Sequence, residues 1–197
     1  PFSHAKQRQT KKDLGFNEHE PLVVITGGGL GAASINGAVT KVMPDLLSFT
    51  SVALIAGEAH VDEIKQSLKS HKNLQIHGYL ASDAMQQMLG AADIVVSRAG
   101  ATTLLELAAL AKPSIIVPNA HLTGGHQIKN AEVYKQAKAV VVLDDAQLEA
   151  EPLSLVDAIN ATLLNKATMQ RLSKNIHAFA KPDAAKDMAK MIIEAAR

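Results

Sequence analysis

Two threonines and a glutamate in one short segment carry the strongest chemical signal in this chain. The apolar run Ile94–Val96 leads into the small-residue turn Ser97-Arg-Ala-Gly-Ala101, after which Thr102 and Thr103 open a helical pattern and Glu106 follows one turn later. The first amides of a helix lack intrahelical partners and lie at the positive end of its dipole, so they bind anions. A carboxylate one turn further on can accept two hydrogen bonds from a vicinal diol. A phosphate and a diol together describe a nucleotide.

The spacing of Thr103 and Glu106 also fits an ordinary capping box, in which each side chain bonds the backbone amide of the other residue. In that case the pair would only start the helix of a βα unit. The residues alone leave both interpretations open. Ser97 is not a candidate nucleophile, because no motif places a His–acid pair beside it.

A second candidate loop is the glycine-rich turn Thr26-Gly-Gly-Gly-Leu-Gly-Ala32, which follows a buried apolar run. It fits a permissive dinucleotide fingerprint, G-x-G-x-x-G/A, and its glycines let the backbone approach a ligand closely. A dinucleotide site also needs an acidic residue roughly 20 residues further on, and Glu58 lies well past that distance. This weakens an NAD-binding interpretation, while a tight turn with close helix packing stays open as an alternative.

Three other features are weaker candidates. A metal site at His121 and His126 would lack a third ligand. Arg98 stands at a strand end, where a guanidinium would suit bidentate phosphate binding. The pair Asp144-Asp145 is typical of a solvated turn.

Composition excludes several classes of protein. The chain has 197 residues, 47% of them hydrophobic, which fits one globular domain with a full core. A net charge of +1 and an aromatic content of 3% argue against a nucleic-acid binder. The absence of cysteine excludes disulfides and thiol catalysis. The sequence shows no signal peptide and no apolar run of the roughly 18 residues that a membrane span requires.

Short apolar runs alternate with helical patterns along the chain, which predicts an α/β fold: a Rossmann-like parallel six-stranded sheet with helices on both faces. Residues 1–20 are polar and include four basic side chains, so we interpret them as a solvated linker with some helical turns. The predicted strands are 22–26, 52–55, 74–76, 94–96, 114–117 and 140–143. The predicted helices are about 31–43, 60–70, 83–90, 102–111, 126–136, 152–164, 167–178 and 183–196.

Taken together, the motifs resemble the C-terminal, donor-binding half of the MurG-type UDP-GlcNAc transferases, glycosyltransferase family 28. They occur in the order and spacing of that family, and the resemblance runs from about Pro1 to the end of the chain. It implies one half of a GT-B glycosyltransferase. The matching pieces are Gly27-Gly-Gly-Leu-Gly-Ala32, Gly78-Tyr-Leu80, Ser97-Arg-Ala-Gly-Ala101 with Glu106, and His126-Gln127 with Asn130-Ala131.

The resemblance implies a binding site for UDP-GlcNAc. The position of Leu80 lines the uracil pocket in the family, where the backbone near this residue forms a hydrogen bond with the base. Tyr79 either flanks the base or closes the edge of the core. We interpret Asn130 as an anchor of its helix or loop rather than as a ligand contact, and the resemblance gives Arg98 a structural role in an interdomain cleft. The implied binding residues are Gly28, Gly29, Leu30, Tyr79, Leu80, Gly100, Ala101, Thr102, Thr103, Glu106, His126 and Gln127, of which the last two reach the sugar hydroxyls and a phosphate.

The implied activity is inverting transfer of GlcNAc to an undecaprenyl-linked muramyl pentapeptide, the step from lipid I to lipid II in peptidoglycan synthesis. No Asp-x-Asp motif occurs, so we expect no metal and no cofactor. We expect the base, the acceptor site and the membrane surface on an N-terminal acceptor domain. This chain would then hold no catalytic residue, and it would work at the cytoplasmic face of the cell membrane as a peripheral protein.

The expected organisation is a linker over residues 1–20 and a donor-binding domain with C-terminal helices over residues 21–197. The chain starts at Pro1 and its first residues resemble the family linker, so we expect a fragment cut between two domains. Two alternatives stay open: the catalytic subunit of a naturally split UDP-sugar transferase, and an NAD-binding oxidoreductase domain.

Overall fold

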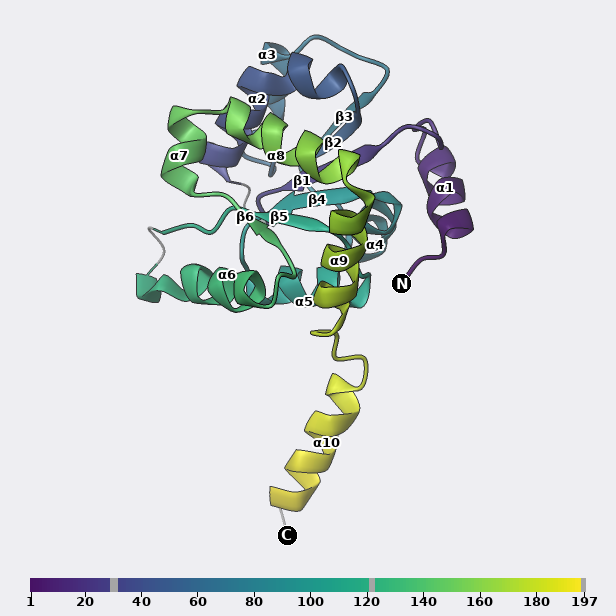
Figure 1. The fold of residues 1–197 in the computed structure, drawn as a ribbon, viewed down its shortest axis with the longest axis vertical. Coiled ribbons are helices and arrows are strands. Elements are labelled where there is room, and N and C mark those ends of the chain that lie inside the picture. The colour runs from purple at the N-terminus through teal and green to yellow at the C-terminus, as the bar shows by residue number, and fades with distance from the viewer. Residues whose placement is uncertain (29–31, 121–122, 196–197) are drawn as a thin grey trace.

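A six-stranded parallel sheet forms the centre of the computed structural model, which describes residues 1–28, 32–120 and 123–195 (Figure 1). The strand order is β3-β2-β1-β4-β5-β6, as expected for a Rossmann-like fold. Every neighbouring pair is parallel, and the register joins Val24 of β1 to Ala53 of β2 and to Val95 of β4. The strands are β1 (Leu22–Thr26), β2 (Ser51–Ile55), β3 (Leu74–His77), β4 (Ile94–Ser97), β5 (Ser114–Ile116) and β6 (Val141–Val142).

Helices connect and flank these strands, and most of them lie within a few residues of the predicted ranges. A short 3₁₀ turn, η1 (Thr123–Gly125), precedes α6. The helices are α1 (His4–Asp13), α2 (Ala33–Leu47), α3 (Val61–Ser67), α4 (Ser82–Ala91), α5 (Ala101–Ala109), α6 (His126–Gln136), α7 (Asp145–Ala150), α8 (Leu153–Leu164), α9 (Lys166–His177) and α10 (Ala184–Ala195).

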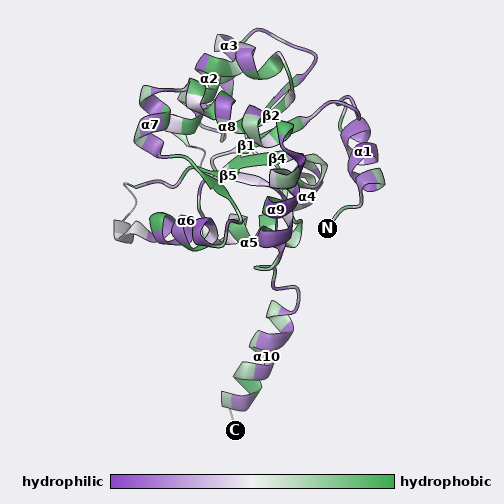
Figure 2. Cartoon of the chain, in the orientation of Figure 1, coloured by the Kyte–Doolittle hydropathy of each residue, from purple (hydrophilic) through white to green (hydrophobic). Residues whose placement is uncertain are grey.

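Alternate residues of each strand point to opposite faces, so the sheet has a core on each side. On one face Val24 and Val95 pack with residues of α4, α5, α6 and α9. On the other face Val23 and Val96 pack with residues of α2, α3, α7 and α8. Figure 2 shows mainly hydrophobic strands at the centre, surrounded by helices in which hydrophobic and hydrophilic residues alternate. Burial on both faces explains why the strands read as continuous apolar runs.

The last helix, α10, extends away from the body of the molecule (Figure 1). None of its described residues is buried, and its apolar side chains Met188, Met191, Ile192 and Ile193 are exposed. In the described parts of the chain, no helix is both long enough and apolar enough to cross a membrane.

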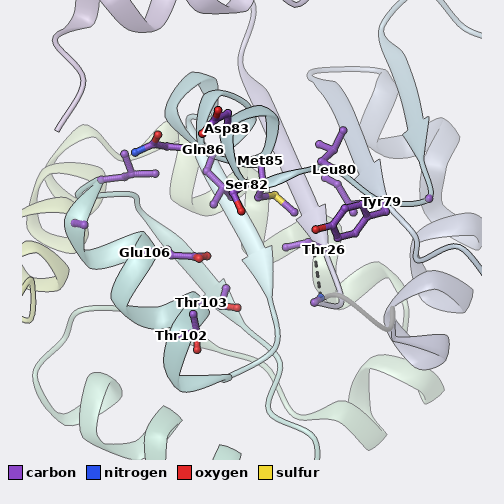
Figure 3. A pocket seen from close by; sticks show the side chains of 16 residues that line it. Thr26, Tyr79, Leu80, Ser82, Asp83, Met85, Gln86, Thr102, Thr103 and Glu106 are labelled. Carbon is purple, nitrogen blue, oxygen red and sulfur yellow. Dashed lines mark hydrogen bonds between the residues drawn. The ribbon is translucent and has the colours of Figure 1, made fainter. Parts of the chain in front are cut away.

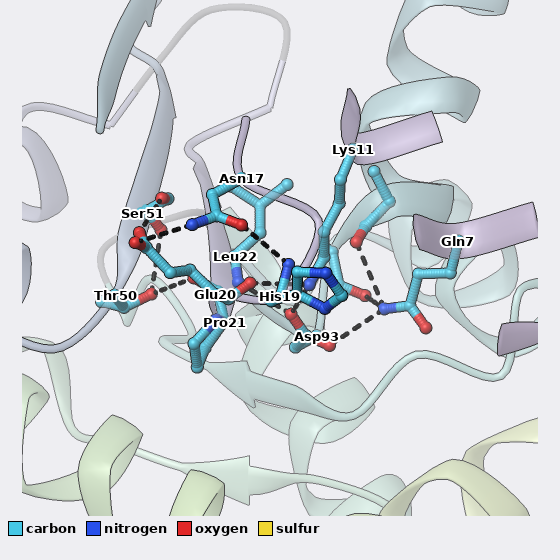
Figure 4. Close-up of polar contacts among 12 residues, drawn as sticks. Gln7, Lys11, Asn17, His19, Glu20, Pro21, Leu22, Thr50, Ser51 and Asp93 are labelled. Atoms are coloured by element: carbon cyan, nitrogen blue, oxygen red, sulfur yellow. Dashed lines mark hydrogen bonds and ion pairs between the residues drawn. The ribbon is translucent and has the colours of Figure 1, made fainter. Parts of the chain in front are cut away.

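The first twenty residues pack on the domain, so the prediction of a solvated linker is wrong for part of this segment. Helix α1 packs against α4, and Lys11 is only 4% exposed. Its ammonium forms an ion pair with Asp93, which also accepts a hydrogen bond from the Leu22 amide at 2.7 Å (Figure 4). A buried ammonium needs such a partner, and Asp93 lies too far along the sequence for a local pattern to reveal it.

Two side chains from outside α4 satisfy the carbonyl groups at its C-terminal end. Lys112 donates to the oxygens of Gly90 and Ala92 at 2.7 and 2.9 Å. The amide of Gln7 donates to the oxygens of Ala91 and Ala92 at 3.2 and 2.8 Å. The last carbonyls of a helix lack intrahelical partners, so these contacts tie both α1 and the segment before β5 to the end of α4.

The ion pair between Lys11 and Asp93 generates a stability prediction. Asp93→Ala removes the partner of a buried charge, so we expect it to lower the free energy of unfolding by about 3 kcal/mol. Urea denaturation followed by circular dichroism measures this. Asp13→Ala is the matched control, because Asp13 is exposed and accepts a hydrogen bond from Gln9 on the same helix. It should cost less than about 0.5 kcal/mol. Equal losses for the two variants would show that Lys11 does not depend on Asp93.

Burial of Lys112 generates a pH prediction. Desolvation lowers the pKa of its ammonium from 10.5 to about 8, with a further lowering by Lys11, while Asp93 opposes the shift. Between these values the unfolded chain binds more protons than the folded chain, so the stability of the folded state rises with pH. Relative to Lys112→Met, the wild-type free energy of unfolding should rise by about 2 kcal/mol from about pH 7 to about pH 10. A difference that stays constant across this range, measured by denaturation at each pH, would contradict the lowered pKa.

Candidate functional site

The strand order opens a gap at the carboxyl edge of the sheet. The chain runs outward from β1 to β2 and β3, and then returns to build β4, β5 and β6 on the other side. Helix α2, which follows β1, packs on one face, and α5, which follows β4, packs on the other. The loops after β1 and β4 therefore diverge at this edge, which is where open α/β sheets bind their ligands.

A cavity of about 580 Å³ lies at this gap (Figure 3). Figure 3 places Thr102, Thr103 and Glu106 of α5 on one side of it, and Tyr79 and Leu80 on the other. Its volume falls within the usual range of small-molecule sites. The lining residues are Thr26, Gly28, Ile55, Gly78, Tyr79, Leu80, Ser82, Asp83, Met85, Gln86, Leu89, Thr102, Thr103, Glu106, Ala109 and Leu110.

The N-terminus of α5 has no side-chain cap. Gly100 is its N-cap residue, with φ −67° and ψ 137°, and within the described part of the chain no side-chain hydrogen bond caps this end. The first helical hydrogen bond runs from the Leu104 amide to the Gly100 oxygen at 2.9 Å. The capping-box interpretation of Thr103 and Glu106 is therefore wrong, because Thr103 already lies within the first turn. The amides at the start of α5 are left for an external acceptor.

Glu106 and Thr102 stand on the same face of α5, four residues apart, and both line the cavity. Both side chains are exposed. Within the described ranges, no hydrogen bond or ion pair engages the Glu106 carboxylate or the Thr102 hydroxyl. The start of α5 therefore offers its amides to an anion, and Glu106 offers a hydrogen-bond acceptor. Because a helix rises about 1.5 Å per residue, the two lie about one turn apart along the axis.

The end of β1 and the loop after it reach the same cavity through Thr26 and Gly28. Gly28 has φ +85°, a conformation that glycine adopts without strain. Its amide donates to the Thr26 hydroxyl at 3.2 Å, which folds the start of the loop back on the strand. The predicted binding residues Gly29 and Leu30 lie outside the described residues.

On the opposite wall, Tyr79 and Leu80 have different environments. Tyr79 is 60% exposed, so the alternative in which its ring closes the edge of the core is wrong. Leu80 packs partly against the core on the α4–α5 face. Gly78 lies against the Glu58 carboxylate, which is where a side chain at position 78 would project. Tyr79 thus lines the cavity while most of its ring stays exposed.

Helix α4 contributes a wall that the sequence analysis missed. Ser82, Met85, Gln86 and Leu89 lie on one face of this helix at spacings of three and four residues and line the cavity. The available signal was the position of α4 directly after the loop that holds Tyr79, at the same edge of the sheet. That face of α4 mixes polar and apolar residues, so its sequence pattern did not indicate a binding surface.

His126 and Gln127 do not line this cavity. The Gln127 side-chain oxygen accepts a hydrogen bond from the Asn119 amide at 2.9 Å, so here it braces its own loop. Asn130 is the expected anchor: its amide donates to the Ala99 oxygen at 3.0 Å and holds the turn before α5. His121, the other histidine of the candidate metal pair, lies outside the described residues.

Arg98 does not line the cavity and instead contacts other residues of the protein. It is 9% exposed and donates to the Val117 oxygen at 3.1 Å and to the Ser34 hydroxyl at 2.6 Å. It also forms an ion pair with Asp145 at 2.8 Å. The prediction that Asp144 and Asp145 form a solvated turn is wrong, because Asp145 is 8% exposed and starts α7, which Asp144 caps.

Residues 22–188 match the glycosyltransferase family 28 C-terminal domain. The chain is 35% identical over 185 residues to a Bacillus subtilis protein named UDP-N-acetylglucosamine–N-acetylmuramyl-(pentapeptide) pyrophosphoryl-undecaprenol N-acetylglucosamine transferase, covering 91% of this chain and 50% of that protein. A protein of the same name from Caldicellulosiruptor saccharolyticus is 32% identical over 198 residues, which cover 98% of this chain and 52% of the relative. The chain thus spans about half the length of the curated relatives that it matches.

Solved structures share the fold. The crystal structure of Acinetobacter baumannii MurG aligns with a TM-score of 0.78 at 20% identity, covering 98% of this chain and 54% of that one. The C-terminal CMP-Kdo binding domain of WaaA from the same organism aligns with a TM-score of 0.62 at 14% identity, covering 90% of this chain and 98% of that domain. With the family match and the sheet order in agreement, the chain belongs to glycosyltransferase family 28, as a C-terminal domain of the GT-B architecture.

Proposed function

We propose that the chain is the donor-binding half of an inverting transferase that moves GlcNAc from UDP-GlcNAc to an undecaprenyl-linked muramyl pentapeptide. The observation that carries the proposal is a single cavity that joins an uncapped helix N-terminus, Gly28 and the Glu106 carboxylate. The relatives' names supply the sugar and the acceptor. In this assignment the transfer is a step of peptidoglycan synthesis. A partner domain binds the acceptor and contacts the cytoplasmic face of the membrane. We assign donor binding to residues 21–197. We assign to residues 1–20 the role of the linker to the partner domain.

Each part of the donor has a proposed position. The diphosphate lies at the start of α5, against the backbone from Gly100 to Thr103 and beside Gly28. The ribose hydroxyls donate to Glu106. The base lies further along α5, between Tyr79 and Leu80 and the face of α4 that holds Met85 and Leu89. For Gly29, Leu30, His126 and Gln127, contact with the diphosphate or the sugar is supported by the family resemblance.

The chemistry that this half supports is departure of the nucleoside diphosphate. In an inverting transfer an acceptor hydroxyl attacks the anomeric carbon while a base takes its proton, and the bond to the UDP oxygen breaks. Negative charge then grows on the departing diphosphate. Helix amides and the α5 dipole that already point at this position stabilise the charge without reorganising. The base belongs to the proposed acceptor domain, so this chain alone should bind donor without transferring sugar.

Ligand class is the first test of this function. UDP and UDP-GlcNAc should raise the melting temperature of the chain, while NAD should not. Ligand binding to the folded state stabilises it by about 2.7 kcal/mol at a hundredfold excess over Kd. Differential scanning fluorimetry measures the shift, and calorimetry gives the affinity. A shift with NAD and none with UDP would replace the transferase assignment with the oxidoreductase alternative.

Glu106 is the second test. Glu106→Gln should weaken UDP binding by about 1.5–3 kcal/mol, the range for a hydrogen bond to a charged group. The preference for UDP over 2′-deoxy-UDP should also fall, because the lost acceptor serves the ribose hydroxyls. Glu132→Gln is a matched control, since Glu132 is exposed on α6 and bonds Gln136 of the same helix. Unchanged affinity in a folded Glu106→Gln variant would remove the ribose contact from the proposal.

A further inference from the structure

Arg98 joins the N-terminus of α5, where the diphosphate is proposed, to the N-terminus of α2, the helix that follows Gly28 in the chain. It lies between β4 and α5, two residues before the N-cap of α5, and donates to the hydroxyl of Ser34 at 2.6 Å. Ser34 is the second residue of α2, whose N-cap is Ala32. The contact therefore holds the start of α2 against the turn before α5.

Asp145 completes this link from a third element. Its Oδ1 atom lies 2.8 Å from an Arg98 nitrogen and accepts a hydrogen bond from Ser34 at 2.8 Å. The three side chains thus form a closed triangle between the β4–α5 turn, α2 and α7. The other Arg98 contact, to the Val117 oxygen at 3.1 Å, adds the segment after β5.

The charge of Arg98 explains why a carboxylate is needed at this place. A buried guanidinium without a partner is strongly unfavourable, and the diphosphate proposed nearby would attract it. With Asp145 present, the guanidinium is neutralised and stays on Ser34. The carbonyl of Ala99 is held independently by Asn130 at 3.0 Å, so the turn before α5 is fixed from both sides.

We propose that Arg98 and Asp145 are positioning residues that hold the N-termini of α2 and α5 at the separation which the diphosphate of the donor requires. The inference rests on the proposed function, because it assumes a nucleoside diphosphate at α5. Neither residue touches the donor in this assignment. The effect of breaking the link should therefore be confined to the phosphate part of the ligand, since the ribose and base positions are built from α4, α5 and Tyr79.

The test compares UDP with uridine by NMR titration of the 197-residue chain, for wild type and three variants. Asp145→Asn should weaken UDP binding about tenfold, as small displacements of a preorganised site do, while uridine binding stays unchanged. Ser34→Ala removes the bridging hydroxyl, keeps the ion pair and should shift UDP affinity in the same direction. Asp144→Asn is the matched control: Asp144 caps α7 through the Gln147 amide and has no contact with Arg98, so its UDP affinity should equal that of the wild type.

Several outcomes would overturn the inference. UDP affinity that is unchanged or higher in folded Asp145→Asn would mean that Arg98 is not needed on Ser34, or that it binds phosphate better when released. Equal losses for UDP and uridine would show a general loosening of the fold. If Asp145→Asn does not fold, unchanged UDP binding by Ser34→Ala overturns the inference instead. A wild-type chain that binds no UDP would overturn the proposed function itself, which is a separate result.

Discussion

The handedness of parallel crossovers is the constraint on which the site depends. A right-handed connection between parallel strands places its helix on a face that is set by the direction in which the sheet grows. Growth from β1 toward β3 therefore puts α2 on one face, and growth from β4 toward β6 puts α5 on the other. Both helices begin at the carboxyl edge, and among the described residues no side chain caps either of them. The cavity between α4 and α5 follows from this arrangement before any side chain is specified.

Buried side-chain contacts then determine how the helices pack, which the strand order alone does not specify. Among the described residues, Lys11, Arg98 and Lys112 are buried cations, and each of them joins segments that are distant in the sequence. Lys11 ties α1 to the start of β4, Lys112 ties the segment before β5 to the end of α4, and Arg98 ties α2 to the start of α5. Because a buried cation is stable only with its partners in place, each contact specifies one arrangement. Helix α4 receives the contact from Lys112 at its C-terminal end and lines the cavity with the face that holds Ser82, Met85, Gln86 and Leu89.

The sequence predicts features that depend on residues close together in the chain, but not contacts between side chains that are far apart in it. The strands were predictable because burial on both faces leaves Val and Ile in continuous runs, and Thr102 and Glu106 were predictable because their spacing is helical. The role of Asp145 was not, because its partner Arg98 belongs to a different βα unit and two adjacent aspartates look solvated. The capping box was undecided for a related reason: the spacing of Thr103 and Glu106 is the same whether the helix starts at Thr103 or, as here, at Ala101 after Gly100.

The most direct test of the central claim is a crystal structure of this chain with UDP-GlcNAc bound. We predict diphosphate density at the start of α5, within hydrogen-bond distance of the amides that follow Gly100. The ribose hydroxyls should contact the Glu106 carboxylate, and the base should lie between Tyr79 and α4. A nucleotide bound elsewhere on the chain, or bound at this edge with its phosphates directed away from α5, would contradict the account.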